Sequence, residues 1–126
     1  MSASLTPSRL RYLLVIAQIA RETGGAVRCI DIAVRLGVAR ASVCRMVSAF
    51  VREGLLTQAG GRGGVRLTAR GEEAAAQCVR RCERLRGAMA SRFALSDYDA
   101  RECAMALLTG LPDATLAALE AGAAET

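Results

Sequence analysis

The sequence predicts a mostly α-helical protein with one small β-hairpin, on three observations. The chain is rich in alanine, the strongest helix former, and has only two prolines in 126 residues. Apolar residues recur at helical spacing along most of it. One glycine-rich stretch lies between two short apolar runs, which is typical of a hairpin. A chain of this length accommodates one domain, or one lobe with a short helical extension.

Two helices are expected before residue 37. The Thr-Pro-Ser sequence at 6–8 places a capping hydroxyl and a proline at a helix start, and the glycine pair at 24–25 ends this helix. A shorter helix covers about Ile30 to Leu36, and the residues expected on its inner side are Ala33 and Leu36.

A third helix follows a tight turn at Gly37-Val38. It runs from about Ala39 to Glu53, and Gly54 favours its end there because glycine tolerates the left-handed conformation. The apolar stripe that this helix turns toward the core consists of Val43, Met46, Val47, Phe50 and Val51.

Two short strands and a long helix come next. The strand candidates are Leu55–Thr57 and Val65–Leu67, joined by the glycine-rich residues 59–64. A long helix capped by Thr68 then reaches about Ala94. Its small and apolar positions form a heptad-like seam for packing along another helix, at Ala75, Cys78, Cys82, Leu85 and Met89.

Two further helices are expected in the last part of the chain. The Ser96-x-x-Asp99 sequence resembles a capping box for a helix that runs through about Thr109. Leu111-Pro112-Asp113 then opens a last short helix, which carries Leu116 and Leu119.

The charge of the chain is uneven. Its formal net charge is +5, and all 17 basic residues are arginines. Through Leu67 ten arginines stand against three carboxylates, whereas after Leu67 seven arginines stand against nine carboxylates. A basic first half is typical of a lobe that meets a polyanion. Arginine also suits phosphate groups and guanine edges better than lysine does.

Five cysteines and no histidine limit the chemistry. An odd number of cysteines cannot pair completely within the chain, and we find neither a signal peptide nor a run that could span a bilayer. We therefore expect a cytoplasmic protein with no membrane partner. Because histidine, the commonest general base, is missing, we expect no enzymatic activity.

The order helix, tight turn, helix and glycine-tipped hairpin is that of a winged helix-turn-helix, which predicts double-stranded DNA as a partner. In such a domain, the outer, N-terminal residues of the third helix face the major groove. Here the residues predicted to contact bases are Arg40, Ala41, Ser42 and Arg45. Arg62, at the hairpin tip, is predicted to enter the minor groove. The arginines predicted to bind phosphate groups are Arg28, Arg52 and Arg66.

Two stretches resemble the diphtheria-toxin-repressor and manganese-transport-regulator family of metal-dependent transcriptional regulators. One is residues 32–43, Ile-Ala-Val-Arg-Leu-Gly-Val-Ala-Arg-Ala-Ser-Val, continuing through Arg-Glu-Gly-Leu at 52–55. The other is residues 67–74, Leu-Thr-Ala-Arg-Gly-Glu-Glu-Ala. The likeness continues to Leu119 and so covers nearly the whole chain. It implies a homodimer, with a winged helix-turn-helix DNA-binding domain at 1–68 and a helical dimerisation domain at 69–126.

The family resemblance also implies a site for iron or manganese, with ligands from the first helix, the long helix after the wing and the helix after that. In this sequence Arg11 stands where a Met or Asp ligand is expected, Cys82 where a His is expected and Arg86 where a Glu is expected. On the next helix Asp99 and Cys103 fall on ligand positions, but a Glu–His pair is replaced by Ala106 and Leu107. Such ions favour carboxylates and imidazoles, so we expect that ordinary metal sensing is lost and that no cofactor is needed.

Two interpretations of the effector site stay open. In one, the protein is a metal-independent regulator, a repressor by resemblance. In the other, Cys82 and Cys103, with Cys78 and Asp99, form a soft site for zinc or copper or respond to thiol chemistry. Against the second, Cys78 and Cys82 lie on the seam that we expect to be buried, where cysteine is a common small core residue.

A third interpretation is a winged-helix protein-interaction module, because one fold hosts several functions. The other two cysteines, Cys29 and Cys44, are expected to be ordinary residues. Oxidation of Cys44, on the third helix, would nevertheless disturb a DNA contact.

Overall fold

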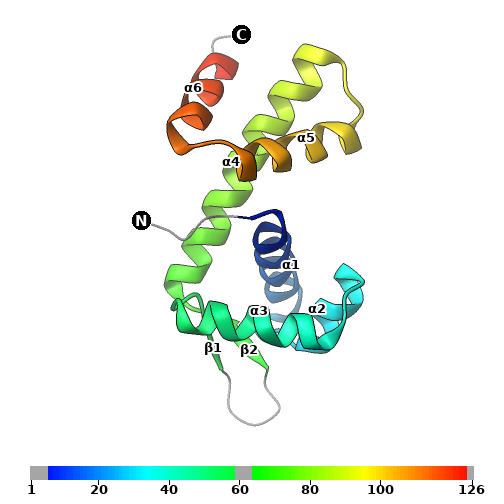
Figure 1. Cartoon of the computed structure of the whole chain (residues 1–126), viewed down its shortest axis with the longest axis vertical. Helices are drawn as coiled ribbons and strands as arrows, with labels where there is room; N and C mark the ends of the chain where they lie inside the picture. Colours follow the sequence, from blue (N-terminus) through cyan, green and yellow to red (C-terminus); the bar gives the residue numbers. More distant parts are fainter. Residues whose placement is uncertain (1–5, 59–63, 125–126) are drawn as a thin grey trace. The chain divides into compact units, whose positions relative to one another are not determined.

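The computed structural model describes residues 6–58 and 64–124 (Figure 1). As predicted, the described chain is mostly helical with one two-stranded sheet. It divides into two compact units: residues 11–76, which we call the winged-helix unit, and the remaining described residues, which we call the helical unit. Among the described helices, none combines the length and the apolar character needed to cross a membrane.

The first helix, α1, spans Pro7–Thr23, and its predicted start is confirmed. The hydroxyl oxygen of Thr6 accepts a hydrogen bond from the backbone N–H of Arg9 at 3.1 Å, which satisfies one of the amides that a helix start leaves unpaired. Residues spaced by three on α1, Leu13, Ile16 and Ile19, are buried in the winged-helix unit.

Helices α2 (Cys29–Leu36) and α3 (Arg40–Arg52) pack against each other. Helix α2 begins one residue before the predicted Ile30, and Ala39 and Glu53 are the residues that flank α3. The buried face of α2 consists of Ile32 and Ala33, while the predicted inner residue Leu36 is only half-buried.

The hairpin pairs β1 (Leu56–Gln58) with β2 (Val65–Leu67) in antiparallel register. Strand β1 starts one residue later than predicted, because the N–H of Leu55 donates to the carbonyl oxygen of Phe50 at 2.9 Å and so belongs to the turn that closes α3. Strand β1 packs against α3, and the side chains of Leu56 and Val65 are buried in the core.

The long helix α4 spans Ala69–Phe93, and Thr68 caps it as predicted. The Thr68 hydroxyl accepts from the N–H of Gly71 at 3.0 Å and donates to the carbonyl oxygen of Gly54 at 2.6 Å. One side chain thus ties the start of α4 to the end of the preceding turn.

Helices α5 (Asp97–Gly110) and α6 (Asp113–Ala124) complete the described chain. The hydroxyl of Ser96 accepts from the N–H of Asp99 at 3.1 Å, so the predicted cap of α5 is present. The core of the helical unit is built from small and branched side chains: Leu85, Ala100, Ala104, Leu108 and Leu116. The domain boundary that the sequence suggests after Thr68 stays a prediction.

Candidate nucleic-acid interface

Helix α3 has one buried face and one exposed face. Val43, Val47 and Phe50 are buried, as the apolar periodicity predicts, whereas Met46 and Val51 of the predicted stripe are only half-buried. The side chains on the other face near the helix N-terminus are Arg40, Ala41, Cys44 and Arg45, all exposed, with Ser42 half-exposed. The four residues predicted to contact bases therefore share one accessible end of one helix.

The turn between α2 and α3 determines the direction in which the exposed face of α3 points. Gly37 ends α2 with φ 67° and ψ 38°, a left-handed conformation that a residue with a side chain rarely adopts. The N–H groups of Gly37 and Val38 both donate to the carbonyl oxygen of Ala33, at 2.9 and 3.1 Å. This closes α2 and lets α3 begin after only three residues.

The starts of α2 and α3 carry no capping side chain. Arg28 precedes α2 and Ala39 precedes α3, and neither forms a side-chain hydrogen bond to the helix that follows. First-turn amides and the positive end of the helix dipole attract anions such as phosphate. Both helix starts therefore suit the backbone of a nucleic acid, beside the guanidinium groups of Arg28 and Arg40.

Arg45 and Ser42 lie one turn apart on the exposed face. A guanidinium nitrogen of Arg45 is 3.4 Å from the hydroxyl oxygen of Ser42, at the long limit of a hydrogen bond. This weak contact leaves both polar groups able to exchange it for a stronger one with a ligand. Arginine binds guanine through two parallel hydrogen bonds, and serine is tolerant of either donors or acceptors.

The hairpin beside α3 is extended by a third backbone segment. Val27 forms an antiparallel bridge with Val65, with two hydrogen bonds of 2.8 Å between their backbones. The sequence did not predict this bridge, because a single residue in a loop has no alternating pattern to reveal it. The bridge fixes the hairpin to the segment that leads into α2.

Arg66 lies on the exposed side of the hairpin, opposite Thr57 in the strand register. Its guanidinium group packs over Gly25: a Cβ atom built on that glycine would lie 2.2 Å from an Arg66 nitrogen. The absence of a side chain at Gly25 therefore leaves room for this guanidinium group. Arg62, predicted for the wing tip, lies outside the described residues.

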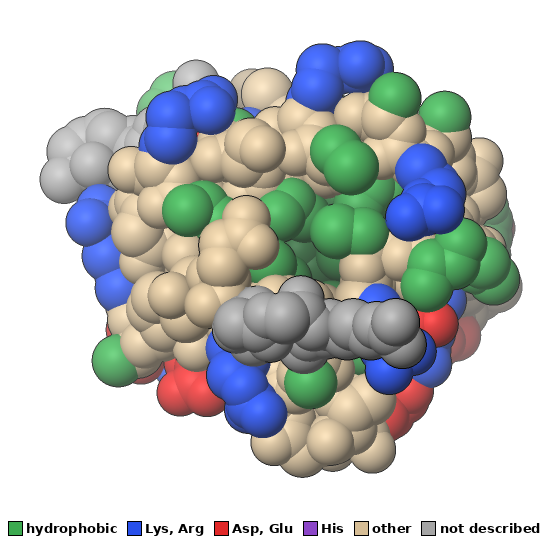
Figure 2. Space-filling view, turned by 90° about the horizontal axis from the view of Figure 1, so that it is seen from below, with side chains coloured by type: hydrophobic (Ala, Val, Ile, Leu, Met, Phe, Trp, Pro, Cys, Tyr) green, Lys and Arg blue, Asp and Glu red, His purple; other side chains and the backbone are tan. Residues whose placement is uncertain are grey.

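The remaining predicted contacts, Arg28 and Arg52, are both exposed, at the start of α2 and at the end of α3. Figure 2 shows arginine side chains spread around the face that carries the hairpin, with hydrophobic side chains in the hollow at its centre. The structure thus places the described DNA-contact candidates on the surface of the winged-helix unit, but whether they touch DNA stays a prediction.

Three exposed apolar side chains on and after α2 were not anticipated. Ile30 is 43% exposed, Val34 is 72% exposed and Val38 is 37% exposed. Their spacing of four residues is the signal that could have revealed a common outer face, but the same spacing is usual for a buried stripe.

Cys29 and Cys44 belong to neighbouring elements of this unit. Burial raises the pKa of the half-buried Cys29 thiol, the nearby Cys44 raises it further, and Arg40 opposes the shift. Cys29 is therefore a protonated thiol at neutral pH, whereas Cys44 is exposed on the outer face of α3.

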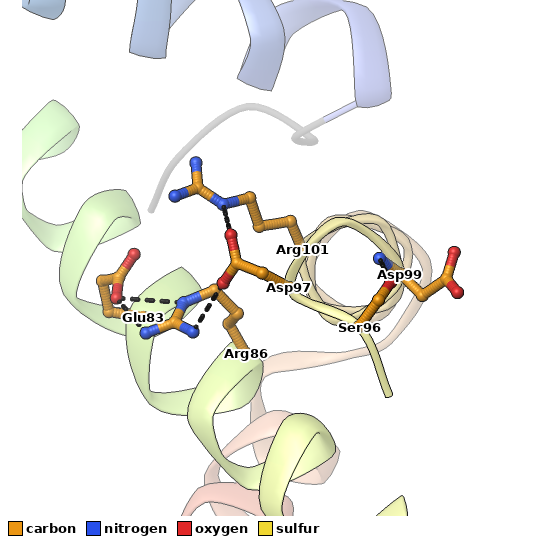
Figure 3. A network of polar contacts seen from close by, with 6 residues as sticks. All are labelled: Glu83, Arg86, Ser96, Asp97, Asp99 and Arg101. Carbon is orange, nitrogen blue, oxygen red and sulfur yellow. Dashed lines mark hydrogen bonds and ion pairs between the residues drawn. The ribbon is translucent and has the colours of Figure 1, made fainter. Parts of the chain in front are cut away.

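The positions at which the family resemblance implies metal ligands lie partly in the helical unit, and the residues there do not fit a hard divalent ion. Arg86 stands where a Glu ligand is expected, and its guanidinium group donates to the neighbouring Glu83 at 2.8 Å and Asp97 at 3.0 Å (Figure 3). Asp99 points away from this network in Figure 3. Within residues 6–58 and 64–124, no three His, Cys, Asp or Glu side chains form a group that could hold a metal ion.

The candidates for a soft site are free thiols with mixed surroundings. The side chains of Cys78, Cys82 and Cys103 are half-buried. Burial raises the pKa of Cys78 and of Cys82, and the charge of Glu83 raises that of Cys82 further, against the effect of Arg101 and Arg86. A cation at Cys82 would therefore meet two guanidinium groups.

Comparison with known proteins supports the helix-turn-helix. Residues 10–60 match the model of the IclR helix-turn-helix domain. No curated protein matches the chain significantly. Among solved structures, a hypothetical protein from Sulfolobus solfataricus is 20% identical with a TM-score of 0.74, and the match covers 97% of this chain and 92% of that one.

Two regulators have similar structures over a part of their length. IdeR from T. acidophilum is 21% identical with a TM-score of 0.70, over 92% of this chain and 52% of that chain. The manganese regulator SloR is 19% identical with a TM-score of 0.75, over 93% of this chain and 54% of that chain. The chain thus spans about half the length of these two proteins. At such identities the likeness establishes a shared fold, and with the domain match it supports a DNA-binding regulator of transcription with a winged helix-turn-helix.

Proposed function

We propose that this protein is a sequence-specific DNA-binding transcriptional repressor that acts as a homodimer and has lost the metal dependence of the family it resembles. The observation that carries the proposal is the division of α3, with Val43 and Val47 buried while Arg40 and Arg45 are exposed. An α-helix fits the major groove of B-form DNA, where every base pair presents a distinct pattern of donors and acceptors.

The outer end of α3 has the side chains for reading bases. Arg45 and Arg40 can each donate two hydrogen bonds to guanine, Ser42 can bind either a donor or an acceptor, and Ala41 can contact the methyl group of thymine. The arginines at the edges of the unit, Arg28, Arg52 and Arg66, would bind phosphate groups and fix the register of the helix without reading sequence.

A second copy of the chain is the partner that we propose for the helical unit. A single helix-turn-helix reads one half-site, and two-fold symmetric dimers read two half-sites one helical turn apart. The helical unit offers apolar surface for such an interface, because Phe93 is 63% exposed and Tyr98 is 71% exposed. We therefore propose residues 69–126 as the dimerisation domain and residues 1–68 as the DNA-binding domain.

The structural neighbours accord with this family. SloR is a manganese regulator, and the likeness to it covers 93% of this chain. Metal dependence does not follow, because Arg86 stands at a position where a Glu ligand is expected and its guanidinium group is hydrogen-bonded to the neighbouring carboxylates of Glu83 and Asp97. The alternative of a soft-metal or thiol-responsive sensor at Cys82 and Cys103 has less support, since arginines flank Cys82.

A salt titration of DNA binding tests the proposal. Fluorescence anisotropy with duplexes from the protein's own genomic neighbourhood should show affinity that falls as salt is added. A plot of the logarithm of the association constant against the logarithm of the salt concentration should have a slope of about −0.9 for each phosphate neutralised. The Arg52→Ala variant should make this slope shallower by about one, since it neutralises one phosphate fewer than the wild type. Arg92→Ala, the same change on α4, is the control and should leave the slope unchanged.

If the protein does not bind DNA, or binds it with an affinity that does not change with salt, the proposal is contradicted and the protein-interaction module is favoured. Sedimentation of the same samples tests the dimer: a species of twice the 13.2 kDa chain mass is expected at micromolar concentration. A monomer that still binds DNA would contradict the homodimer but not the proposed role of α3 in DNA binding.

A further inference from the structure

Four charged side chains form a cluster between α4 and the start of α5. Glu83 and Arg86 lie on α4, and Asp97 and Arg101 lie on α5 (Figure 3). Arg86 is at its centre and its side chain is 27% exposed. Its Nε and Nη2 atoms donate to the same oxygen of Glu83 at 3.1 and 2.8 Å, and its Nη1 atom donates to Asp97 at 3.0 Å.

Asp97 lies between two guanidinium groups. Its second carboxylate oxygen accepts from the Nε atom of Arg101 at 3.1 Å, so both oxygens of Asp97 are used. Asp97 is also the first residue of α5, where a negative charge is favoured by the helix dipole. Arg86 therefore links a residue of its own helix to the start of the next helix.

The cluster is balanced in charge: two carboxylates face two guanidinium groups. Arginine stays protonated in proteins, and its planar group matches carboxylates in two directions at once. Hydrogen bonding to Glu83, followed by the charges of Glu83 and Asp97, raises the pKa of Arg86 further. A divalent cation would have to displace or approach these positive groups before it could reach Glu83 or Asp97.

We propose that Arg86 serves as a built-in cation of the helical unit, holding Glu83 and Asp97 together and excluding metal ions from the α4–α5 turn. This inference rests on the proposed function of a DNA-binding regulator. The helical unit keeps the same structure with and without metal, so DNA binding does not depend on metal supply. At the position of Arg86, where the family resemblance implies a Glu ligand, the chain thus supplies a positive charge of its own.

Reversing the charge of Arg86 tests the inference. The wild-type protein should melt at the same temperature in EDTA and in a large molar excess of Mn²⁺ or Zn²⁺. The Arg86→Glu variant places a third carboxylate beside Glu83 and Asp97, so its melting temperature should rise with Mn²⁺ by about 4 °C or more once the ion exceeds its dissociation constant about 100-fold. Arg92→Glu, with the same charge change on α4 and a hydrogen bond to the carbonyl oxygen of Gly122 in the wild type, is the control and should not respond to Mn²⁺.

Arg86→Gln supplies the test if Arg86→Glu does not fold. Glutamine keeps a polar side chain but removes the positive charge, so this variant should gain a measurable Mn²⁺ response that the wild type lacks. A wild-type protein that is stabilised by metal, or variants at Arg86 that stay indifferent to metal, would overturn the inference.

DNA binding in EDTA and in Mn²⁺ separates this inference from the proposed function. Binding of equal strength in both is expected. If the protein binds no DNA but shows the expected melting behaviour, the proposed function fails and the role of Arg86 stands. If DNA binding requires metal, the role of Arg86 and the proposed loss of metal dependence both fail, while the proposed DNA-binding role stands.

Discussion

Gly71, in the first turn of α4, lies directly against the carbonyl group of Leu55. A Cβ atom on Gly71 would be 2.0 Å from the carbonyl oxygen and 2.9 Å from the carbonyl carbon of Leu55, with a Leu67 methyl group at 3.1 Å. Backbone atoms cannot move aside as a flexible side chain can. The start of α4 and the base of the hairpin can therefore approach this closely only with glycine at position 71.

We expect the Gly71→Ala variant to be less stable than the wild type by about 1–3 kcal/mol, the usual cost of inserting a methyl group into a packed site. Gly87→Ala on the same helix is the matched control, because a Cβ atom there meets nothing within 4 Å. It should be neutral or stabilising by up to about 1 kcal/mol, since alanine favours a helix over glycine. Urea unfolding followed by circular dichroism measures both; equal stability of the two variants would show that Gly71 does not make this close approach.

Thr68 provides a second test of the same junction. Its hydroxyl both caps α4 and donates to the carbonyl oxygen of Gly54, so Thr68→Ala should lower the free energy of unfolding by about 1–2 kcal/mol. Thr68→Ser keeps the hydroxyl group and should retain most of the stability. If serine and alanine destabilise the protein equally, the threonine methyl group and not the cap is responsible.

The ion pairs of Glu120 predict how the helical unit responds to acid. The Glu120 side chain is 13% exposed and accepts hydrogen bonds from Arg81 at 2.8 Å and from Arg84 at 2.8 Å. Burial raises the pKa of this carboxyl group, but the hydrogen bonds and charges of Arg81 and Arg84 outweigh burial, and the pKa is lowered from 4.5. The contribution of Glu120 to stability is therefore complete above pH 4.5 and is lost as the pH falls through the lowered value.

We expect Glu120→Gln to lower the melting temperature at neutral pH, and the difference from the wild type to shrink as the pH is lowered below 4.5. Thermal melts of both proteins from neutral to acidic pH, down to about pH 3, measure this. A difference that is constant over that range would mean that the charge of Glu120 does not stabilise the fold.

Cysteine modification tests whether the outer face of α3, which we propose contacts bases, is accessible. Cys44 lies on the accessible face of α3, whereas Cys29 is half-buried with a raised pKa and should react slowly. Alkylation with iodoacetamide should therefore add a group to Cys44 first and weaken DNA binding by blocking close approach to the groove. The Cys44→Ser variant should keep its affinity under the same treatment; a decrease of the same size there would place the sensitive thiol elsewhere.

The sequence predicted most of the fold because the information is local. Helix starts at Thr6, Thr68 and Ser96 were readable from a hydroxyl residue before an apolar pattern, and each has the hydrogen bond expected of it. The bounds of β1 shifted by one residue, because the closing hydrogen bond of the turn from Leu55 to Phe50 competes with the strand.

The features that the sequence did not reveal depend on tertiary placement. The bridge of Val27 with Val65 joins two segments far apart in the chain, and no local pattern marks it. Of the ion pairs of Arg86, only the one with Glu83 lies at helical spacing; the one with Asp97 crosses a turn and needs the fold. The exposed side of α3 was predictable from periodicity, but which bases or phosphates its residues touch is set by DNA as well as by the protein.

Arg45 is the residue through which we propose that the N-terminal end of α3 reads base sequence. Selection of bound duplexes from a randomised pool, followed by sequencing, measures this directly for the wild type, for Arg45→Ala and for the control Arg92→Ala. We expect a defined preferred sequence for the wild type and the control, and a decrease of about 1–3 kcal/mol in discrimination at one or two positions for Arg45→Ala. Identical sequence preferences for all three proteins, or no preference in any of them, would contradict it.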